Sequence, residues 1–221
     1  MKDFKFFIKE TFDSYKCKSR FDILKCLPVY NDENELIAYL RPITSDYRQS
    51  IRNCAEFMGD WRAQNPSISN STFDITIERT ERWLDNLIIG RDDRLLFLIQ
   101  MLNGEYVGHV GYSSFNYDLE LAEIDSILRG VKNAYPGIMT YSIRTLLWWG
   151  KNVIKLKEIE LSTEEDNEKS MALYERCGFI IKKKKALIKV VKEDEVRWDP
   201  AENEDMENAE RYSIVMKYNG D

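Results

Sequence analysis

Apolar residues recur along the chain with two different periods, and these predict both strands and helices. The run 94–102 is almost continuously apolar over the length of one strand, which is typical of a strand buried on both faces. Asn103-Gly104 follows it directly and is a strong signal for a tight hairpin. A strand at 105–113 should therefore return antiparallel to the first. Farther on, 138–153 places apolar residues three and four positions apart, as one face of a helix does.

The stretch 119–179 organises the rest of the chain. Its predicted elements are a strand at 119–128, a turn at 129–137, a helix at 138–153, a strand at 157–162 and a segment ending in a helix at 167–179. Together with the preceding hairpin, this order gives an antiparallel meander followed by helix, strand and helix. We therefore predict an α/β (α+β) fold with a mixed, mostly antiparallel central sheet flanked by helices.

The two ends of the chain should extend this sheet and cover it. The elements expected before the meander are a core-docking helix within 1–20, a hairpin of strands at 21–30 and 35–42, a helix at 46–61, a polar loop at 63–73 and a helix ending at Gly90. Those expected at the C-terminal end are a strand at 180–191, an acidic loop at 192–210 and a strand at 211–218. We divide the chain into an N-terminal extension, 1–35, and one domain, 36–221.

Composition excludes several classes of protein. The chain has 221 residues, 43% of them hydrophobic, which suits a globular protein with a real core. Its net charge of −6 argues against nucleic acid as a partner, since a phosphate backbone needs a basic face. No apolar run is long enough to span a bilayer and the N-terminus does not resemble a signal peptide, so we expect a cytoplasmic protein with no membrane partner. One histidine and four cysteines without a CxxC pair predict no metal site and free thiols.

The segment 167–179 carries the most specific motif. Asn167, Ala172, Tyr174 and Cys177-Gly178-Phe179 follow a short strand in the spacing N-x-x-[small]-x-x-[LF]-Y-x-x-x-G-F. In this it resembles the GNAT superfamily of acyl-CoA-dependent N-acetyltransferases. The resemblance spans roughly 38–218 and implies acetyl-CoA as the acyl donor, a small-molecule amine as the acceptor, and direct attack of the amine on the thioester.

The turn at 129–137 departs from the family pattern. The family usually places Arg/Gln-x-x-Gly-x-Gly/Ala at the pyrophosphate, whereas glycines are sparse here and the loop is longer. A helix N-terminus still presents unpaired N–H groups to phosphate, and Gly137 would stand in for the central glycine. The cofactor contacts that the resemblance implies are Ile127, Leu128, Arg129, Gly137, Ile138, Met139, Thr140 and Asn167. Asn167 also suits a plain helix N-cap.

The resemblance gives Tyr174 the role of proton donor to the leaving thiolate. A tyrosine hydroxyl with a pKa near 10 suits a thiol whose free pKa is about 8.5. The alternative is an aromatic side chain that only packs the helix against the sheet.

Three residues are candidates for the base that deprotonates the amine. Strand alternation places Glu123 and Asp125 on one face together with Ile127 and Arg129, and repulsion between the two acids should raise the pKa of one of them. Each acid singly is also compatible with a solvated face. His109, the single histidine, has a pKa suited to proton transfer, although a lone strand histidine is more often structural. We place Asp125 and Glu123 ahead of His109.

The acceptor is expected to lie against the N-terminal helices. Trp61 could stack on a sugar or base and Arg62 could bind a phosphate, although Trp61 also suits the core. The Trp-Arg pair and the string Ile-Asp…Arg-Gly…Pro-Gly-Ile-Met resemble the GNAT branch that acetylates nucleotide-linked amino sugars. Acetylation of a protein N-terminus or an aminoglycoside, and a CoA-binding interaction module with weak catalysis, are the alternatives. A homodimer is compatible with the sequence.

Overall fold

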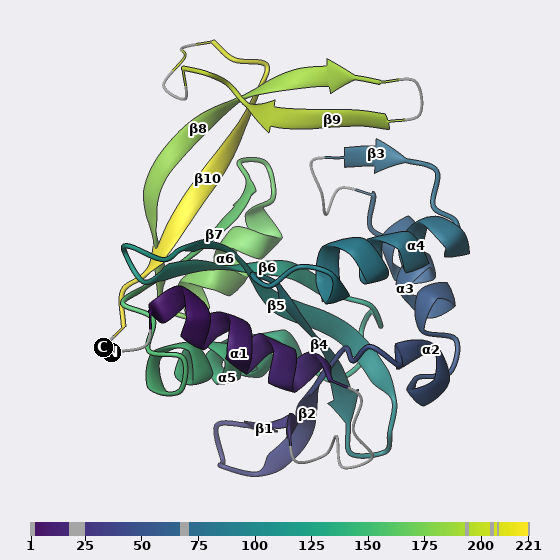
Figure 1. Ribbon diagram of the computed structural model, residues 1–221. Helices are drawn as coiled ribbons and strands as arrows, with labels where there is room; N and C mark the ends of the chain where they lie inside the picture. The colour runs from purple at the N-terminus through teal and green to yellow at the C-terminus, as the bar shows by residue number, and fades with distance from the viewer. Residues whose placement is uncertain are drawn as a thin grey trace.

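The computed structural model describes residues 3–17, 25–66, 71–192, 195–203, 206 and 208–220. The described residues form one ten-stranded sheet (Figure 1). Its strands, in spatial order, are β1 (Leu27–Tyr30), β2 (Leu36–Pro42), β4 (Leu95–Met101), β5 (Tyr106–Asn116), β6 (Leu121–Arg129), β7 (Glu158–Glu164), β10 (Arg211–Tyr218), β8 (Phe179–Val191), β9 (Glu195–Pro200) and β3 (Ser71–Phe73).

Helices cover both faces of the sheet and bury a separate core on each. On one face lie α1 (Phe4–Lys16), α5 (Ile138–Asn152) and α6 (Glu168–Arg176). On the other lie α2 (Tyr47–Ser50), α3 (Cys54–Ala63), α4 (Ile77–Trp83) and its π-helical continuation η3 (Leu84–Ile89). The docking predicted for the N-terminal helix is confirmed, because Ile8 and Phe12 of α1 are fully buried in the first core. Among the described helices, none has the length and apolarity needed to cross a bilayer.

The predicted meander is confirmed. Strands β4, β5 and β6 are consecutive antiparallel neighbours, and β4 is buried along nearly its whole length. The β4–β5 turn contains Gly104 at φ 89°, a left-handed conformation that glycine adopts without steric cost. After α5 the chain returns as β7, which pairs with β6 in parallel. The fold is therefore the mixed, mostly antiparallel sheet flanked by helices that the sequence predicts.

A bulge in β6 changes the side-chain alternation from the one that the sequence predicts. Gly111 pairs with Asp125 and His109 pairs with Leu128, so two residues of β6 face one residue of β5. Ser126 adopts the left-handed region at φ 53°, which reverses the alternation beyond it. Ile127 therefore packs against the first core, whereas Leu128 lies in the second. The prediction that Ile127 shares a face with Glu123 and Asp125 is wrong for this reason.

Three local predictions need correction. The single helix expected at 46–61 is two helices, α2 and α3, because the chain turns between them and Asn53 sits at φ 55°. The polar loop at 63–73 ends in strand β3, and the acidic loop at 192–210 begins with strand β9. The first part of the strand predicted at 21–30 lies outside the described residues.

Strands β8 and β9 form an arm that reaches beyond the central sheet. Strand β8 pairs with β10 at one end and with β9 at the other. Strand β3 then pairs with β9 through three residues, Ser71–Phe73 against Glu195–Arg197. This contact joins the arm to the segment between α3 and α4, so that the arm and the helices meet on one side of the sheet (Figure 1).

Candidate active site

A gap opens in the sheet where β6 and β7 diverge. The two strands pair only at Leu121–Glu158, Ala122–Ile159 and Glu123–Glu160. Beyond these pairs each strand is hydrogen-bonded on its outer side, β6 to β5 and β7 to β10. Each therefore keeps one backbone edge facing the gap, and such an edge can pair with an extended, amide-bearing ligand.

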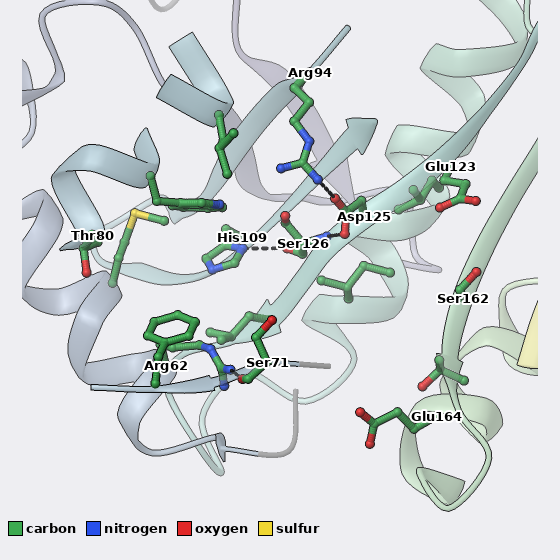
Figure 2. Close-up of a pocket in the computed structure, with 18 of the residues that line it drawn as sticks. Arg62, Ser71, Thr80, Arg94, His109, Glu123, Asp125, Ser126, Ser162 and Glu164 are labelled. Atoms are coloured by element: carbon green, nitrogen blue, oxygen red, sulfur yellow. Dashed lines mark hydrogen bonds and ion pairs between the residues drawn. The ribbon is translucent and has the colours of Figure 1, made fainter. Parts of the chain in front are cut away.

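A cavity of about 810 Å³ lies at this gap, within the usual size range for small-molecule sites (Figure 2). It is lined from both faces of the sheet, since Tyr174 belongs to the first core and Met58 and Leu128 to the second. The lining residues of β6 and β7 are Glu123 to Leu128 and Ser162 to Glu164. A ligand lying in the gap could thus reach side chains on both faces.

The two acids of β6 have different surroundings. Asp125 Oδ2 accepts hydrogen bonds from Arg94 Nη2 at 2.6 Å and from Ser113 Oγ at 3.0 Å. Burial raises the pKa of Glu123, and the negative charges of Asp125 and Glu160 raise it further. The predicted rise in the pKa of one acid is confirmed for Glu123, with burial as the larger cause. Glu123 is therefore better suited than Asp125 to accept a proton near neutral pH.

His109 is a buried, neutral side chain that lines the cavity. Its ring centroid lies 6.3 Å from that of Trp61 and 6.4 Å from that of Trp83, and burial lowers its pKa to about 4. Its Nδ1 is 2.5 Å from the carbonyl oxygen of Ser126, which can only accept, so the proton sits on Nδ1. Nε2 is thereby left as an acceptor, and the Nδ1–H bond holds the bulge of β6.

Tyr174 projects from α6 and lines the same cavity with 5% of its surface exposed. Burial raises the pKa of its hydroxyl to about 12, so it carries its proton at any physiological pH and can donate it. Asn167, at the start of α6, accepts a hydrogen bond from the Ser170 backbone N–H at 3.2 Å, as an N-cap does. It also lines the cavity. Tyr174, Glu123, Asp125 and His109 are thus brought together at one site.

The predicted cofactor contacts are in two places. Ile127, Leu128 and Asn167 line the cavity. Residues 137–140 form the N-terminus of α5 and are not among the described residues that line the cavity. Gly137 is the N-cap at φ 80°, and the helical ladder begins with the Tyr141 N–H to Gly137 bond. The backbone N–H groups of Met139 and Thr140 precede this bond and are the donors available to a phosphate.

Arg129 is engaged within its own loop. Its guanidinium donates to the carbonyl oxygens of Val131 and Ala134, so it stabilises the long turn that leads into α5. Asn133 and Tyr135 in this turn adopt positive φ, as Gly137 does. The turn therefore keeps its conformation with one glycine in the left-handed region, whereas the family pattern has more than one glycine here.

Of the two predicted acceptor contacts, Arg62 lines the cavity and Trp61 does not. Trp61 is buried, packs on Phe57 and against the Cα of Gly130, and is absent from the described lining. Arg62 does line the cavity, but its guanidinium donates to the carbonyl oxygens of Asn65, Pro66 and Ser71. Burial lowers its pKa. Arg62 therefore fastens strand β3 to α3.

Glu164 is a site residue that sequence reasoning missed. It is 6% exposed at the end of β7 and lines the cavity, where Figure 2 shows it on the side opposite Arg62. Arg211 binds Oε2, while Oε1 has no hydrogen-bond partner among the described residues. Burial raises its pKa. The sequence signal was weak, because the surrounding run Glu164-Glu165-Asp166 reads as a solvated acidic turn.

Comparison with known proteins agrees with this geometry. The family model for the acetyltransferase (GNAT) domain matches residues 38–180, more than half of the chain. The chain belongs to the GNAT acetyltransferase family. It is an N-acetyltransferase that uses acetyl-CoA as the acyl donor. No curated protein matches the sequence.

Solved structures of GNAT enzymes share the fold at low sequence identity. A probable GNAT acetyltransferase from Chromobacterium violaceum has a TM-score of 0.62 at 16% identity, covering 86% of this chain and 85% of that one. A chimera of Vibrio cholerae spermidine N-acetyltransferase with hSSAT has a TM-score of 0.57 at 17% identity, covering 82% and 94%. The dodecameric Vibrio cholerae spermidine N-acetyltransferase has a TM-score of 0.55 at 16% identity, covering 81% and 92%.

The residues present suit acetyl-CoA. The open edges of β6 and β7 can pair with the amides of an extended arm, and the N-terminus of α5 offers N–H groups to phosphate. When bound, acetyl-CoA supplies the acetyl group as a thioester. Asn167 and Tyr174 lie on the α6 side of the cavity and Glu123 lies on β6.

Proposed function

We propose that this GNAT enzyme transfers the acetyl group of acetyl-CoA to the primary amine of a small molecule by direct attack, and that the acceptor is a nucleotide-linked amino sugar. In this proposal Glu123 takes the proton of the amine and Tyr174 gives a proton to the leaving thiolate. The observation that carries it is the cavity at the β6–β7 gap, lined by Glu123 and by Tyr174 from opposite faces of the sheet. The raised pKa of Glu123 suits the base, and the raised pKa of Tyr174 keeps its hydroxyl protonated, so that it can hydrogen-bond to the leaving sulfur.

Direct attack is supported by the types of side chain in the cavity. None of the described residues that line it is a cysteine, the side chain best suited to an acetyl-thioester intermediate on the enzyme. Cys54 and Cys177 are buried elsewhere, and burial raises the pKa of both thiols. Glu123 instead supplies a base for the acceptor amine itself.

A polyamine is the second candidate acceptor. Glu123, Asp125 and Glu164 place three carboxylates on the strand side of the cavity, and carboxylates suit a chain of ammonium groups. The similar Vibrio cholerae enzymes carry the name spermidine N-acetyltransferase. The helix side carries Arg62, Arg79 and Arg82, whose positive charges would repel a second ammonium group of a polyamine. We therefore favour an acceptor with acidic groups.

A thiol-release assay tests the proposal. Acetyl-CoA would be supplied with three acceptors: an amino sugar linked to a nucleoside diphosphate, the free amino sugar, and spermidine. We expect the highest kcat/KM for the nucleotide-linked sugar, with one acetyl group on its amine by mass spectrometry. A higher kcat/KM for spermidine would make a polyamine the acceptor in place of the nucleotide-linked sugar. Tight CoA binding with no turnover of any amine would contradict catalysis.

A further inference from the structure

Glu164, the last residue of β7, lies on the same face of the sheet as Glu123. Ile159 and Leu161 of β7 lie in the first core, so Glu164, an odd number of positions from both, belongs to the opposite face. Glu123 belongs to that face as well, because its neighbour Ala122 lies in the first core. Glu164 and the proposed base therefore share the face that α3 and α4 cover.

The Glu164 carboxylate is buried and only half satisfied. Arg211 of β10 donates to Oε2, whereas Oε1 has no hydrogen-bond partner among the described residues. Burying such an oxygen costs free energy, because water solvates it in the unfolded chain. Glu164 lines the cavity, and Figure 2 shows its carboxylate turned toward the side that carries Arg62. A ligand in the cavity can therefore donate a hydrogen bond to Oε1.

The charges around Glu164 favour a neutral donor. Burial is the largest influence on its pKa and raises it, and the negative charge of Asp166 raises it further. The positive charges of Arg211 and Arg62 act in the opposite direction. Because two arginines balance two acids here, a hydroxyl or an uncharged N–H suits Oε1 better than an ammonium group does.

The neighbouring part of the cavity is rich in neutral polar side chains. Ser213 of β10 pairs directly with Glu164, and its hydroxyl donates to the carbonyl oxygen of Thr163. Hydroxyl and amide groups both donate and accept, which matches the hydroxyl groups of a sugar. The neutral polar residues that β7, α6 with its N-cap, and β10 contribute to the described lining are Ser162, Thr163, Asn167, Ser170 and Ser213.

Glu164 is remote from the proposed base along the strand. Glu123 pairs with Glu160, and Glu164 lies four residues farther along β7, about 13 Å at the usual rise of a strand. A ligand whose amine lies near Glu123 would therefore meet Glu164 with a group distant from that amine. A nucleotide-linked amino sugar carries hydroxyl groups of this kind on its ring and on its ribose.

We propose that Glu164 determines acceptor specificity, with its Oε1 accepting a hydrogen bond from a hydroxyl group of the acceptor. The inference rests on the proposed function and names a contact that selects a hydroxylated amine over a polyamine. Arg211 positions the carboxylate, because its guanidinium holds Oε2 and leaves Oε1 for the ligand. A charged carboxylate also binds a hydroxyl more strongly than a neutral acceptor group does.

Two variants of Glu164 test the contact. In Glu164→Gln the amide oxygen should face Arg211, which can only donate, so that the NH2 group takes the place of Oε1. Glu164→Asp keeps the charge but is shorter by one methylene group. Both should raise KM for a hydroxylated acceptor at least about tenfold, with little change in kcat or in KM for acetyl-CoA. Glu165→Gln is the matched control, because it removes the same charge from an exposed side chain that binds Lys184.

Three amines locate the hydroxyl group in steady-state assays with acetyl-CoA. They are cyclohexylamine, which has no hydroxyl, glucosamine, and uridine diphosphate glucosamine. A rise in KM for glucosamine in the Glu164 variants places the hydroxyl on the sugar ring, and a rise confined to the nucleotide-linked sugar places it on the nucleoside. Cyclohexylamine should be unaffected. An equal loss for all three amines, or no loss for either hydroxylated amine, overturns the contact.

Calorimetric binding separates this inference from the proposed function. Each amine is titrated into the protein saturated with CoA, which requires no acetyl transfer. Tighter binding of glucosamine or its nucleotide-linked form than of cyclohexylamine, lost in both Glu164 variants and kept in Glu165→Gln, supports the contact even for an enzyme that acetylates neither. The wild-type comparison does not depend on how well the variants fold. Equal binding of the three amines, or no measurable binding of the hydroxylated two, overturns the contact and leaves acetyl transfer to other amines intact.

Discussion

At the scale of single residues, the site depends on how differently burial acts on similar side chains. Glu123 and Asp125 are two positions apart on β6, yet Asp125 is ion-paired with Arg94 while burial raises the pKa of Glu123. Tyr174 and His109 are both buried, and burial favours the neutral form of each. The cavity therefore offers a proton acceptor and a proton donor at neutral pH.

Replacing Glu123 by Gln should lower kcat/KM about 10²- to 10⁴-fold, the range for loss of a general base. In the wild type, kcat/KM should rise with pH as Glu123 loses its proton, with the midpoint above the ordinary glutamate value of 4.5. Steady-state rates across pH in the two proteins would show this. Asp125→Asn is the matched control, and an equal or larger loss there would transfer the role to Asp125.

Replacing Tyr174 by Phe should lower kcat about 10²-fold or more while KM for acetyl-CoA changes little, because the lost hydroxyl acts on the leaving thiolate. Single-turnover thiol release would measure the chemical step directly. Tyr141→Phe, at an exposed hydroxyl that donates to Asp32, is the control and should keep wild-type rates. A loss of only a few-fold in Tyr174→Phe would exclude proton donation.

His109 should make the fold sensitive to mild acid. Its pKa is about 4 in the folded protein and near 6.5 in the unfolded chain. Between these values the unfolded chain binds the extra proton, so stability is full above pH 6.5 and falls as pH drops toward 4, by roughly 3 kcal/mol in all. Urea unfolding at pH 7 and pH 5 would measure it. His109→Gln should lose this part of the pH dependence; an unchanged slope would refute the assignment.

At the scale of elements, the cavity depends on two irregularities in the sheet. The bulge at Ser126 turns Ile127 and Leu128 toward opposite cores, and the parallel pairing of β6 with β7 stops after Glu123. The β3–β9 contact adds a third feature, because it brings the arm over the helix side of the cavity. Together, these three features form the cavity in an otherwise continuous sheet.

The β3–β9 contact should hold the acceptor side of the cavity in shape. Thr72 lies in the middle of β3, opposite Val196, and Thr72→Pro removes a backbone donor from this short strand. We expect a higher KM for the acceptor with little change in KM for acetyl-CoA, because the gap between β6 and β7 is untouched. Thr72→Ala is the control. Equal effects on both substrates would mean that β3 supports the whole fold.

At the scale of the whole molecule, the proposed donor and acceptor regions lie on different faces of one sheet. The first core lies with α1, α5 and α6 on the face proposed for the donor, and the second core lies with α2, α3 and η3 on the face proposed for the acceptor. The cavity at the β6–β7 gap is lined by residues of both. Binding of acetyl-CoA in the gap should therefore stabilise both cores together.

Acetyl-CoA should raise the melting temperature of the whole protein. At a concentration of 100 times Kd, a ligand that binds only the folded state adds about 2.7 kcal/mol, or roughly 5–10 °C for a chain of this size. Gly137→Ala should reduce this shift, since Gly137 has φ 80° and a Cβ there would lie 2.7 Å from the Tyr141 ring. Differential scanning calorimetry with and without acetyl-CoA measures both. An equal shift in Gly137→Ala would remove the α5 N-terminus from the donor site.

Local sequence patterns determined most of the elements and half of the site. The apolar run of β4, the hairpin at Asn103-Gly104 and the periodicity of α5 each depend on neighbours a few positions away, so they can be read directly. The motif at 167–179 likewise contains both the N-cap Asn167 and Tyr174. Each of these patterns lies within one short, continuous stretch of the chain.

Only the tertiary structure decided the features that join distant segments. The pairing of β3 with β9, the Arg94–Asp125 ion pair and the Arg211–Glu164 contact link residues that are far apart in the chain. Periodicity carries no information about such partners, because it reports the face of an element and not what the fold places opposite it. The family and the donor were therefore readable from sequence, whereas the choice of Glu123 as the proposed base and of the proposed acceptor side of the cavity depended on burial and pairing in the folded chain.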